Sequence, residues 1–310
     1  MLTRRVWEVY ETRGEPRMTA HRKLMVVLGL ILLFILSSSC GENESLPSPN
    51  PNITLSPGLY YQNLQTKEWT RLATEASEVL IGDLNADGRD DIVGAWPSEG
   101  GLYLFDLVAD EWTKLSSVGD SLAVCDMTGD GRDDLVGSWG EQGIIYRDSA
   151  DGTWSGSLGQ STDVMACADM DQDELGDLVV AWNQELYSYL STTKTWTKLS
   201  SGQPVDLALC DVTGDDVPDM LVSIENGVYY RDTSSGIWSE KLGEQADHLA
   251  CGDVDEDGKA DVLVNYLTGT TGVWIHYSTT GIWASLTYEA DDIVLGDMNN
   301  DHHLDLVGVW

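Results

Sequence analysis

A nine-residue acidic segment occurs six times in this 310-residue chain. The first copy, Asp83-Leu-Asn-Ala-Asp-Gly-Arg-Asp-Asp91, has oxygen-bearing side chains at positions 1, 3, 5 and 9. Alternate oxygen side chains on a tight turn converge on one point, and this number of hard oxygen donors selects Ca²⁺ over softer metals. An EF-hand would also need a bidentate Glu at position 12, where this chain has Gly94. The segment therefore predicts a calcium loop shorter than an EF-hand. Its candidate ligands are Asp83, Asn85, Asp87 and Asp91.

The other five copies keep the same ligand pattern and begin 42 to 44 residues apart. Their candidate ligands are Asp126, Thr128, Asp130 and Asp134; Asp169, Asp171, Asp173 and Asp177; Asp211, Thr213, Asp215 and Asp219; Asp253, Asp255, Asp257 and Asp261; and Asp297, Asn299, Asp301 and Asp305. Position 7 would add a backbone carbonyl in each loop. The alternative is that acidic turns only cap hairpins through Asx-type hydrogen bonds.

Position 6 of each loop ranks the six copies. A tight turn there favours a positive φ, which Gly adopts freely and which Asp or His tolerates better than most residues. Gly stands at this position in the first, second and fifth loops. Asp216 and His302 depart from the pattern mildly, and Glu174 departs from it strongly. We therefore expect the fifth loop, which has four Asp and Gly258, to bind best, and we expect weaker binding by the third.

A second segment also recurs once per repeat. A Gly-hydrophobic-Tyr-like run is followed about ten residues later by Trp, at Trp69, Trp112, Trp154, Trp196, Trp238 and Trp283. A period near 42 residues with short alternating runs indicates four strands per unit, the size of a propeller blade. In one unit, Ser121–Cys125 precedes the acidic loop and Asp134–Trp139 follows it, so the loop would join two paired strands.

The two ends of the repeat region complement each other. The region begins with a hairpin of the second type, Leu59–Leu72, and ends with one of the first type, Ile293–Trp310. Joining them into one blade would close a ring and remove exposed sheet edges. The sequence therefore predicts an all-β fold, a six-bladed β-propeller of four-stranded blades closed by a mixed N- and C-terminal blade. An open array of hairpin modules is the alternative, disfavoured because neither end has a polar capping unit.

The loops and their period resemble the FG-GAP/VCBS repeat family, the repeat also found in integrin α-subunit propellers. The resemblance covers Leu59–Trp310 and all six loops. It implies a calcium-binding β-propeller that acts as a non-enzymatic binding or adhesion module for a protein or a glycan. We expect the Ca²⁺, up to six ions, to be structural, because a hairpin bend with three or four carboxylates would repel itself open without a cation.

The N-terminal residues predict export. An unbroken apolar run, Leu24–Leu36, is too short to span a bilayer; it follows two basic residues and precedes small residues and Cys40. This order is typical of a signal peptide over residues 1–39, with Met18 as an alternative start. It resembles a bacterial lipobox, although Ser37 stands where that pattern prefers Leu. We therefore expect a lipidated Cys40, a flexible tether over residues 40–57 and a propeller over 58–310. An ordinary cleaved signal or an uncleaved anchor remains open.

The composition limits the partners. The chain has 52 acidic and 17 basic residues, a formal net charge of −35 and 42% hydrophobic residues. This argues against nucleic acid or an anionic membrane surface as partner, because both require a basic surface. We expect a monomeric lipoprotein at the cell surface or in the periplasm, attached to the membrane only through its lipid. Twenty of the Asp residues lie at predicted ligand positions, so part of the acidity belongs to the loops.

Four cysteines precede the loops, at Cys125, Cys167, Cys210 and Cys251. An exported protein with four such cysteines suggests disulfides. However, repeat-equivalent positions on neighbouring blades need not meet the Cα separation of roughly 4.4 to 6.8 Å that a bridge requires. We therefore favour small buried thiols over bridges. The cysteines and histidines form no recognisable metal or catalytic motif.

A set of aromatic residues ends the strand after five of the loops, at Trp96, Trp139, Trp182, Tyr266 and Trp310. We expect these rings at the rim opposite the calcium turns, where they could stack on sugars or anchor a protein. Packing between blades is the alternative. For the once-per-repeat hairpin Trp set we favour such packing.

An enzyme is the alternative function, for example a calcium-dependent polysaccharide lyase or hydrolase. Acid and base could come from glutamates in the predicted rim turns, namely Glu99, Glu141, Glu185 and Glu225. The repeat spacing leaves no insertion large enough to build such a site, so we predict no catalytic residue. A residue outside the repeat pattern, deep in the channel and paired with Arg or Lys, would favour the enzyme.

Overall fold

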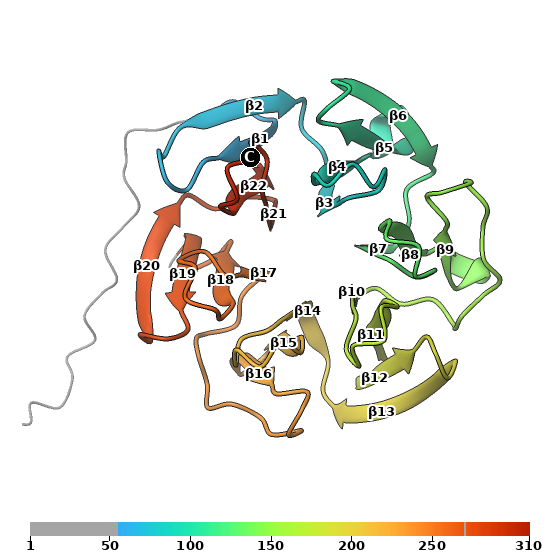
Figure 1. Ribbon diagram of the computed structural model, residues 1–310. Coiled ribbons are helices and arrows are strands. Elements are labelled where there is room, and N and C mark those ends of the chain that lie inside the picture. The colour runs from blue at the N-terminus through green and yellow to red at the C-terminus, as the bar shows by residue number, and fades with distance from the viewer. Residues whose placement is uncertain (1–54, 270) are drawn as a thin grey trace, which may run out of the picture. The chain divides into compact units, whose positions relative to one another are not determined.

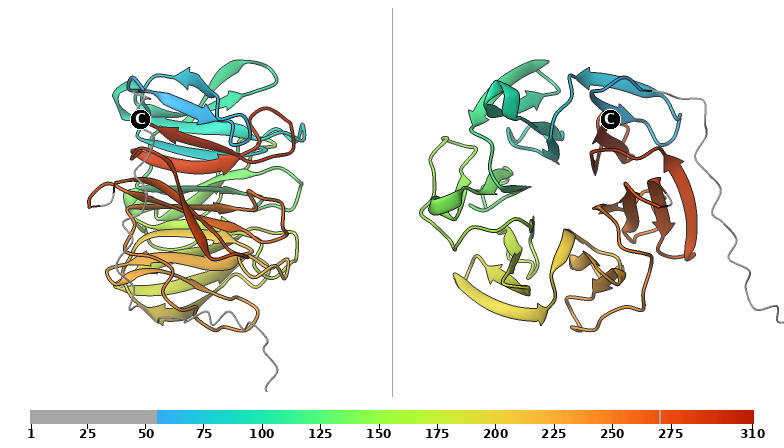
Figure 2. Two further views of the ribbon diagram at one scale, coloured as in Figure 1. Left: turned by 90° about the vertical axis from the view of Figure 1, so that its left-hand side faces the viewer. Right: turned by 180° about the vertical axis from the view of Figure 1, so that it is seen from behind.

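The computed structural model describes residues 55–269 and 271–310, and these form six antiparallel sheets around a central axis (Figure 1). The predicted signal peptide, the lipidation site at Cys40 and almost all of the tether lie outside the described residues. The prediction of an all-β, six-bladed propeller is confirmed. No helix within the described ranges is long and apolar enough to cross a membrane. Figure 2 shows the same ring from the side and from behind.

The first strand of each blade lies nearest the axis. These inner strands are β3 (Glu78–Gly82), β7 (Ser121–Cys125), β10 (Met165–Ala168), β14 (Pro204–Cys210), β17 (His248–Gly252) and β21 (Asp292–Gly296). Each inner strand contacts the inner strand of the next blade all the way round, and β21 contacts β3. The ring is therefore closed at its axis as well as within each blade.

The second strand of each blade is buried almost throughout. These strands are β4 (Asp91–Trp96), β8 (Asp134–Ser138), β11 (Asp177–Trp182), β15 (Asp219–Ile224), β18 (Asp261–Tyr266) and β22 (Asp305–Val309). Every residue of β4 is buried, as is every residue of β8 and β22. A blade is covered on both faces by its neighbours, which is why these strands are continuous apolar runs instead of alternating ones.

The third strands lie outside the second ones: β5 (Gly101–Asp106), β9 (Ile144–Arg147), β12 (Glu185–Leu190), β16 (Gly227–Arg231), β19 (Gly272–Tyr277) and β1 (Leu59–Gln62). Four blades add an outermost strand: β6 (Glu111–Ser116), β13 (Thr195–Ser201), β20 (Ile282–Thr287) and β2 (Trp69–Ala73). Short 3₁₀ turns, η1 (Pro97–Glu99) and η2 (Gly140–Gln142), follow the second strand in two blades.

Two blades have three strands instead of the predicted four. We number the blades 1 to 6 in the order of β3, β7, β10, β14, β17 and β21. In blades 2 and 4 the segment that should form the outermost strand touches its neighbour only through isolated bridges. In blade 2 these bridges are Ile144 to Gly159 and Arg147 to Trp154. Residues 156 and 157 between them leave the ladder, so this edge of blade 2 is irregular.

The mixed blade closes the ring as predicted. Blade 6 has the strand order β2-β1-β22-β21, so both ends of the described chain share one sheet. Leu59 of β1 pairs with Val309 of β22. Beyond this pair, Gly58 and Trp310 exchange backbone hydrogen bonds of 2.6 and 2.9 Å. The blade leaves no unpaired edge between the first and last strands.

The apolar core lies between the blades. Each of its six clusters combines residues of neighbouring blades; in one of them, Val136 of β8 and Leu178 of β11 are both fully buried. Burial of apolar area at roughly 25 cal/mol per Å² is the main stabilising term in such a core. A propeller therefore depends on contacts that are distant in sequence, and no blade can bury its faces alone.

The four cysteines form two disulfides, so the preference for free thiols was wrong. Cys125 bridges to Cys167 and Cys210 bridges to Cys251, with Cα separations of 5.9 and 6.1 Å. The partners are not repeat-equivalent. One lies a single residue before its loop and the other lies two residues before the next loop, and this offset brings them together across two converging inner strands. The bridges join blade 2 to blade 3 and blade 4 to blade 5.

Candidate metal loops and the central channel

The six acidic loops join the inner strand to the second strand of every blade, and they share one hydrogen-bond pattern. The carboxylate at position 1 accepts the backbone N–H groups of positions 5 and 6. In the fifth loop, Asp257 and Gly258 donate to Asp253 at 3.0 and 2.9 Å. The same pair of bonds occurs in the other five loops. Position 1 therefore shapes the turn, as an Asx-type cap does.

Position 6 has a positive φ in all six loops, as predicted. The values are 84° at Gly88, 81° at Gly131, 69° at Glu174, 65° at Asp216, 89° at Gly258 and 68° at His302. Position 4 is also left-handed, which the sequence analysis missed; for example, Ala86 has φ 58° and Glu256 has φ 60°. The third loop thus adopts the common conformation in spite of Glu174, because the rest of the turn holds it there.

Position 9 carries a buried Asp in every blade. Asp134 is fully buried at the start of β8, and its carboxylate accepts the N–H of Met127 at 3.0 Å and that of Ser149 at 2.8 Å. The equivalent Asp177 and Asp261 accept the corresponding pair of amides. Asp219 accepts those of Thr213, at position 3 of its loop instead of position 2, and Thr233. Each of these residues therefore ties its loop to the end of the third strand of the same blade.

Burial raises the pKa of all six position-9 carboxyls, because removal from water disfavours the charged form. The pKa rises to about 7 at Asp91 and to about 6 at Asp134, Asp177, Asp261 and Asp305, and it is also raised at Asp219. Neighbouring loop carboxylates add to the shift in most of these sites. A cation bound in the loop would oppose it by stabilising the charged form.

The structure brings three predicted ligands together in two loops. The carboxylate oxygens of Asp169, Asp171 and Asp177 lie within 4.8 Å of one another, as do those of Asp253, Asp255 and Asp261. These are positions 1, 3 and 9 of the third and fifth loops. The fifth is the loop expected to bind best, and the third is the one expected to be weakened by Glu174.

The remaining loops place an amide or a hydroxyl at position 3. In the first and sixth loops, Asn85 and Asn299 donate to the position-9 Asp at 3.4 and 3.1 Å. In the second and fourth loops, Thr128 and Thr213 occupy that position. The position-5 Asp of each loop accepts the N–H of position 7, as Asp130 does from Arg132 at 3.0 Å. These contacts hold the hairpin in all six loops. Positions 1, 5 and 9 are Asp in every loop, so the loops differ in ligand charge only at position 3.

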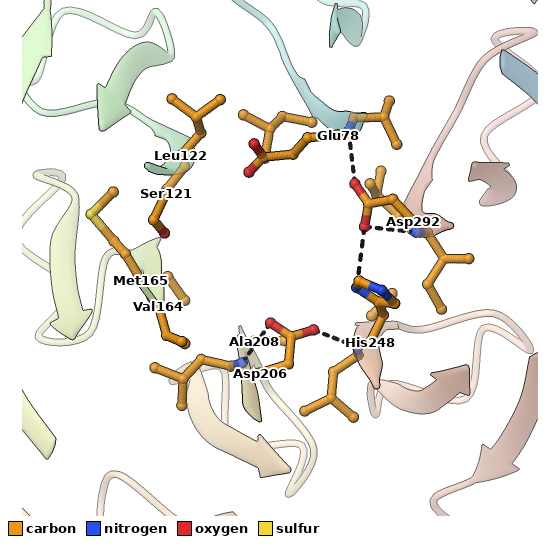
Figure 3. Close-up of a pocket in the computed structure, with 18 of the residues that line it drawn as sticks. Glu78, Ser121, Leu122, Val164, Met165, Asp206, Ala208, His248 and Asp292 are labelled. Carbon is orange, nitrogen blue, oxygen red and sulfur yellow. Dashed lines mark hydrogen bonds and ion pairs between the residues drawn. The ribbon is translucent and has the colours of Figure 1, made fainter. Parts of the chain in front are cut away.

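A hollow of ≈500 Å³ lies on the axis, lined by all six inner strands (Figure 3). One residue from each blade lines it at the position five residues before the loop. These residues are Glu78, Ser121, Val164, Asp206, His248 and Asp292. The acidic members and His248 belong to blades 1, 4, 5 and 6, and the carboxyls of Glu78, Asp206 and Asp292 point toward the hollow in Figure 3.

The channel acids hold neighbouring blades together. Asp292 of blade 6 accepts the N–H of Val79 in blade 1 at 2.7 Å, and Asp206 of blade 4 accepts the N–H of Leu249 in blade 5 at 2.7 Å. The inner edge of an inner strand has no further strand to pair with, so its amides require other acceptors. The acids therefore satisfy backbone donors that face the channel.

Burial raises the pKa of these channel carboxyls. The pKa of Glu78 rises to about 7 and that of Asp206 to about 6, and the pKa of Asp292 is well above its usual range. Desolvation is the main cause in each case. Burial also lowers the pKa of His248, whose Nδ1 lies 3.7 Å from Asp292 Oδ1. Both shifts favour the neutral forms of His248 and Asp292 over the charged ones.

This channel ring was not among the sites predicted from the sequence. A sequence signal for the ring exists, because all six residues lie five positions before the first residue of their loop. The alignment alone does not show that side chains at this position face the axis. The condition set for an enzyme is met only in part. The type of the channel residue differs from blade to blade, but no Arg or Lys is among the described residues that line the hollow.

The rim aromatics pack inside the blades. Trp96, Trp139 and Trp310 each fold back over a Gly two residues earlier on the same face, where a side chain would collide with the ring. Each also meets a hairpin Trp nearly edge-on, as Trp96 does with Trp112 at 5.1 Å between ring centroids. Trp96 is 6% exposed, so its ring faces are not open to a ligand.

The other two members, Trp182 and Tyr266, are half-buried. The indole N–H of Trp182 donates to the carbonyl of Ser161, and the hydroxyl of Tyr266 donates to the carbonyl of Glu244. The expectation that the hairpin Trp residues are in the core holds only in part. Trp69, Trp196 and Trp283 are half-buried, and the last two pack against core clusters. Trp112, Trp154 and Trp238 are 38%, 42% and 39% accessible.

The rim glutamates proposed for an enzyme do not converge. Glu99 and Glu141 belong to the 3₁₀ turns η1 and η2 of blades 1 and 2, and Glu185 and Glu225 lie in blades 3 and 4. Glu185 is paired with Lys198 and accepts a hydrogen bond from Tyr187, and these contacts lower the pKa of Glu185. These residues form no shared acid and base pair.

No protein-family model and no curated protein matches this chain. Solved structures do match it. An auxiliary nutrient binding protein from Bacteroides thetaiotaomicron aligns with a TM-score of 0.49 and 12% identity, over 74% of this chain and 68% of that protein. A protein of unknown function from the same organism aligns with a TM-score of 0.48 and 13% identity, over 83% and 71%. Similarity at this level gives no information on what this chain binds.

Proposed function

We propose that this chain is an exported, calcium-binding propeller of the FG-GAP/VCBS type that acts as a non-enzymatic binding module. The observation that carries the calcium site is the pair of carboxylate triads in the third and fifth loops. An Asn at position 3 could hold the turn, as it does in the first and sixth loops. Asp171 and Asp255 instead add a third negative charge beside two others, an arrangement that a cation stabilises.

The charge at position 3 is costly without a cation. Burial and the adjacent carboxylates, Asp257 and Asp253, raise the pKa of Asp255. Burial and Asp173 and Asp169 do the same to Asp171. Oxygen donors in this number suit Ca²⁺, which accepts flexible geometry, better than Mg²⁺, which requires a regular octahedron. We therefore assign the loops a structural role: bound Ca²⁺ would relieve the repulsion and stabilise the hairpins.

Export is supported by the two disulfides. Bridges of this kind persist in oxidising compartments and are rare in the cytosol of mesophiles. Together with the leader pattern and Cys40, they support attachment at the cell surface or in the periplasm through a lipid. The acidic surface of the chain supports a partner other than nucleic acid.

The calcium proposal is tested by thermal unfolding in Ca²⁺, in Mg²⁺ and in excess EDTA. We expect the melting temperature to fall in EDTA and to recover with Ca²⁺ but much less with Mg²⁺. The informative variant is Asp255→Asn, because it keeps the size and the turn acceptor while removing one charge. In EDTA it should be as stable as the wild type or more stable, and in Ca²⁺ it should be less stable.

Asp110→Asn is the matched control, since Asp110 is an exposed acid outside the loops. It should change neither melt appreciably. Calcium titration by calorimetry should show weaker or fewer sites in Asp255→Asn only. A melt that is the same in Ca²⁺ and in EDTA would sink the structural role of calcium.

A calcium-dependent polysaccharide lyase or hydrolase is the second candidate. It is favoured by one observation, the channel carboxyls, because a pKa of about 7 at Glu78 suits a general acid near neutral pH. Asp206 and Asp292 face the same hollow. Release of reducing ends or unsaturated products from polysaccharides, lost in Glu78→Gln, would place this function above the binding module.

A further inference from the structure

A second hollow lies on the outer half of blade 2, away from the channel. It measures ≈580 Å³ and lies between the end of β6 and the irregular outer segment of blade 2. Its lining includes the rings of Trp139 and Trp154, the amide of Gln142, and Ser116, Ser117 and Ser157. None of its lining residues is charged, although the chain has 52 acidic residues. We call this hollow the blade-2 groove.

Blade 2 lacks a basic side chain that lies over the third strand in two other blades. In blades 6 and 1, a base of the outermost strand lies over a Tyr of the third strand: Arg71 is 5.9 Å from the ring of Tyr60, and Lys114 is 5.6 Å from the ring of Tyr103. In blade 2 the corresponding Tyr position is Ile145. The groove is thus a departure from the repeat and not a feature of every blade.

Blade 4 gives the closest internal comparison, because its outer edge is irregular in the same way. The segments align as Trp154-Ser-Gly-Ser157-Leu158 and Trp238-Ser-Glu-Lys241-Leu242. Lys241 lies against Gly227 and pairs with Glu244 at 2.8 Å. Ser157 stands at this position in blade 2, and its hydroxyl lies near Gly143, but it is shorter than Lys241 and carries no charge. The two edges also differ at Ile145 against Tyr229 and at Gly156 against Glu240.

The groove offers an aromatic face beside neutral polar groups. Trp154 is 42% exposed, and Trp139 holds it edge-on, with ring centroids 5.1 Å apart and an angle of 88°. The indole N–H of Trp139 donates a hydrogen bond to the carbonyl of Ser117 at 3.3 Å. The ring of Trp154 is thus packed against Trp139 and remains partly accessible.

The polar groups of the groove remain able to bind a ligand. Gln142 is exposed, and its side-chain amide makes no hydrogen bond within the described residues, so it can both donate and accept. The hydroxyls of Ser157 and Ser116 each donate to a backbone carbonyl, at 3.0 and 2.8 Å. Their oxygens keep lone pairs that can accept from ligand hydroxyls.

We propose that the blade-2 groove is a subsite for a neutral saccharide, stacked on Trp154 and hydrogen-bonded to Gln142 and Ser157. A sugar ring has an apolar C–H face and a rim of hydroxyls, which match an indole surrounded by amide and hydroxyl groups. An anionic ligand finds no base in the groove and meets a strongly acidic protein, and a cationic ligand finds no carboxylate there. This inference specifies the ligand class of the proposed binding module and rests on that proposal.

The test uses the full chain in Ca²⁺ and a panel of neutral oligosaccharides, namely cellohexaose, maltohexaose, mannohexaose and chitohexaose, with oligogalacturonate and a tryptic peptide mixture as controls. Binding is measured by calorimetry and by the change in Trp fluorescence. We expect at least one neutral oligosaccharide to bind and oligogalacturonate not to bind. Trp154→Ala should weaken the interaction tenfold or more.

Two variants make the test specific. Trp238→Ala removes a ring of similar exposure from the equivalent place in blade 4 and should leave saccharide binding unchanged. Ser157→Lys restores the base of the repeat, should fold as the wild type does, and should block the groove. The calcium-dependent melt is measured on every variant, so failure of the calcium proposal and failure of the groove can be told apart.

The inference is overturned by any of three results. These are no binding of any neutral oligosaccharide in the panel, equal binding by the wild type, Trp154→Ala and Ser157→Lys, or binding of the peptides or oligogalacturonate instead. A loss of binding in Trp154→Ala with an unchanged melt, reproduced in Ser157→Lys, supports it.

Discussion

Asp292 in the last blade accepts the backbone N–H of Val79 in the first blade at 2.7 Å. This bond joins the mixed blade to the first blade, and it lies on the channel wall beside His248 (Figure 3). Val79 and Asp292 are more than 200 residues apart in sequence, so only the closed ring brings them together. The same arrangement recurs between Asp206 and Leu249 in blades 4 and 5.

The bond between Val79 and Asp292 predicts different effects for two substitutions of Asp292. Asp292→Asn keeps an oxygen that accepts from Val79, whereas Asp292→Ala leaves that amide without a partner. At pH 5 we expect Ala to lower the free energy of unfolding by about 1–3 kcal/mol and Asn to change it by less than about 1 kcal/mol. Urea unfolding in constant Ca²⁺ measures both. Equal stability of the two variants would contradict a role for the bond.

The raised pKa of Glu78 predicts a pH-dependent stability. Its pKa is about 7 in the folded protein against 4.5 in the unfolded chain, so the folded state binds more protons between these values. Stability contributed by this group therefore falls as pH rises from about 4.5 to 7. Glu78→Gln should be more stable than the wild type at pH 8, by on the order of 2 kcal/mol, and should show little gain at pH 4.5.

The measurement for Glu78 is a pair of urea titrations at pH 4.5 and pH 8 in constant Ca²⁺. Glu99→Gln, an exposed glutamate of the same blade, is the control and should not alter the difference between the two pH values. If the wild type were more stable than Glu78→Gln at pH 8, the protein would stabilise Glu78 as the anion. The raised pKa of Glu78 would then be wrong.

The disulfides predict that adjacent blades separate more easily after reduction. The bridge between Cys125 and Cys167 closes a loop of 42 residues. Replacing both by Ser should lower the free energy of unfolding by about 2–4 kcal/mol, because the bridge restricts the unfolded chain. Alkylation followed by mass analysis checks the bridges directly: without reductant, none of the four propeller cysteines should react. Labelling of Cys125 before reduction would contradict the pairing.

The left-handed conformation at position 6 predicts that removing a Gly there lowers the stability and that introducing one raises it. A side chain at Gly258 would meet no atom within 4 Å, so Gly258→Ala tests the conformation alone, and it should cost about 1–2 kcal/mol because φ is 89°. Glu174→Gly should stabilise the third loop by up to about 1 kcal/mol, reduced by the greater freedom of the unfolded chain. Urea unfolding with and without Ca²⁺ measures both. A stabilising Gly258→Ala would contradict the turn geometry.

The period and the loops were readable from the sequence because they are local. The oxygen-bearing side chains at positions 1, 3, 5 and 9 depend only on the geometry of one turn, and the positive φ at position 6 follows from the same turn. The closing blade was also predictable, since Leu59–Leu72 and Ile293–Trp310 are complementary halves of one unit. Calcium itself remains a prediction, because the loops are capped hairpins whether or not a cation is bound.

What only the tertiary structure decided lies between blades. Cys125 meets Cys167 because inner strands converge on the axis. The alignment shows that the two cysteines are offset by one residue, but it does not show that the offset positions meet. The channel ring and the blade-2 groove likewise depend on which side of a strand faces the axis and on whether the neighbouring side chain covers a ring. The chain itself determines repeats, turns and their spacing, since these are short-range. The partners that meet across blades are fixed by ring closure and packing, which join residues 42 or even more than 200 positions apart.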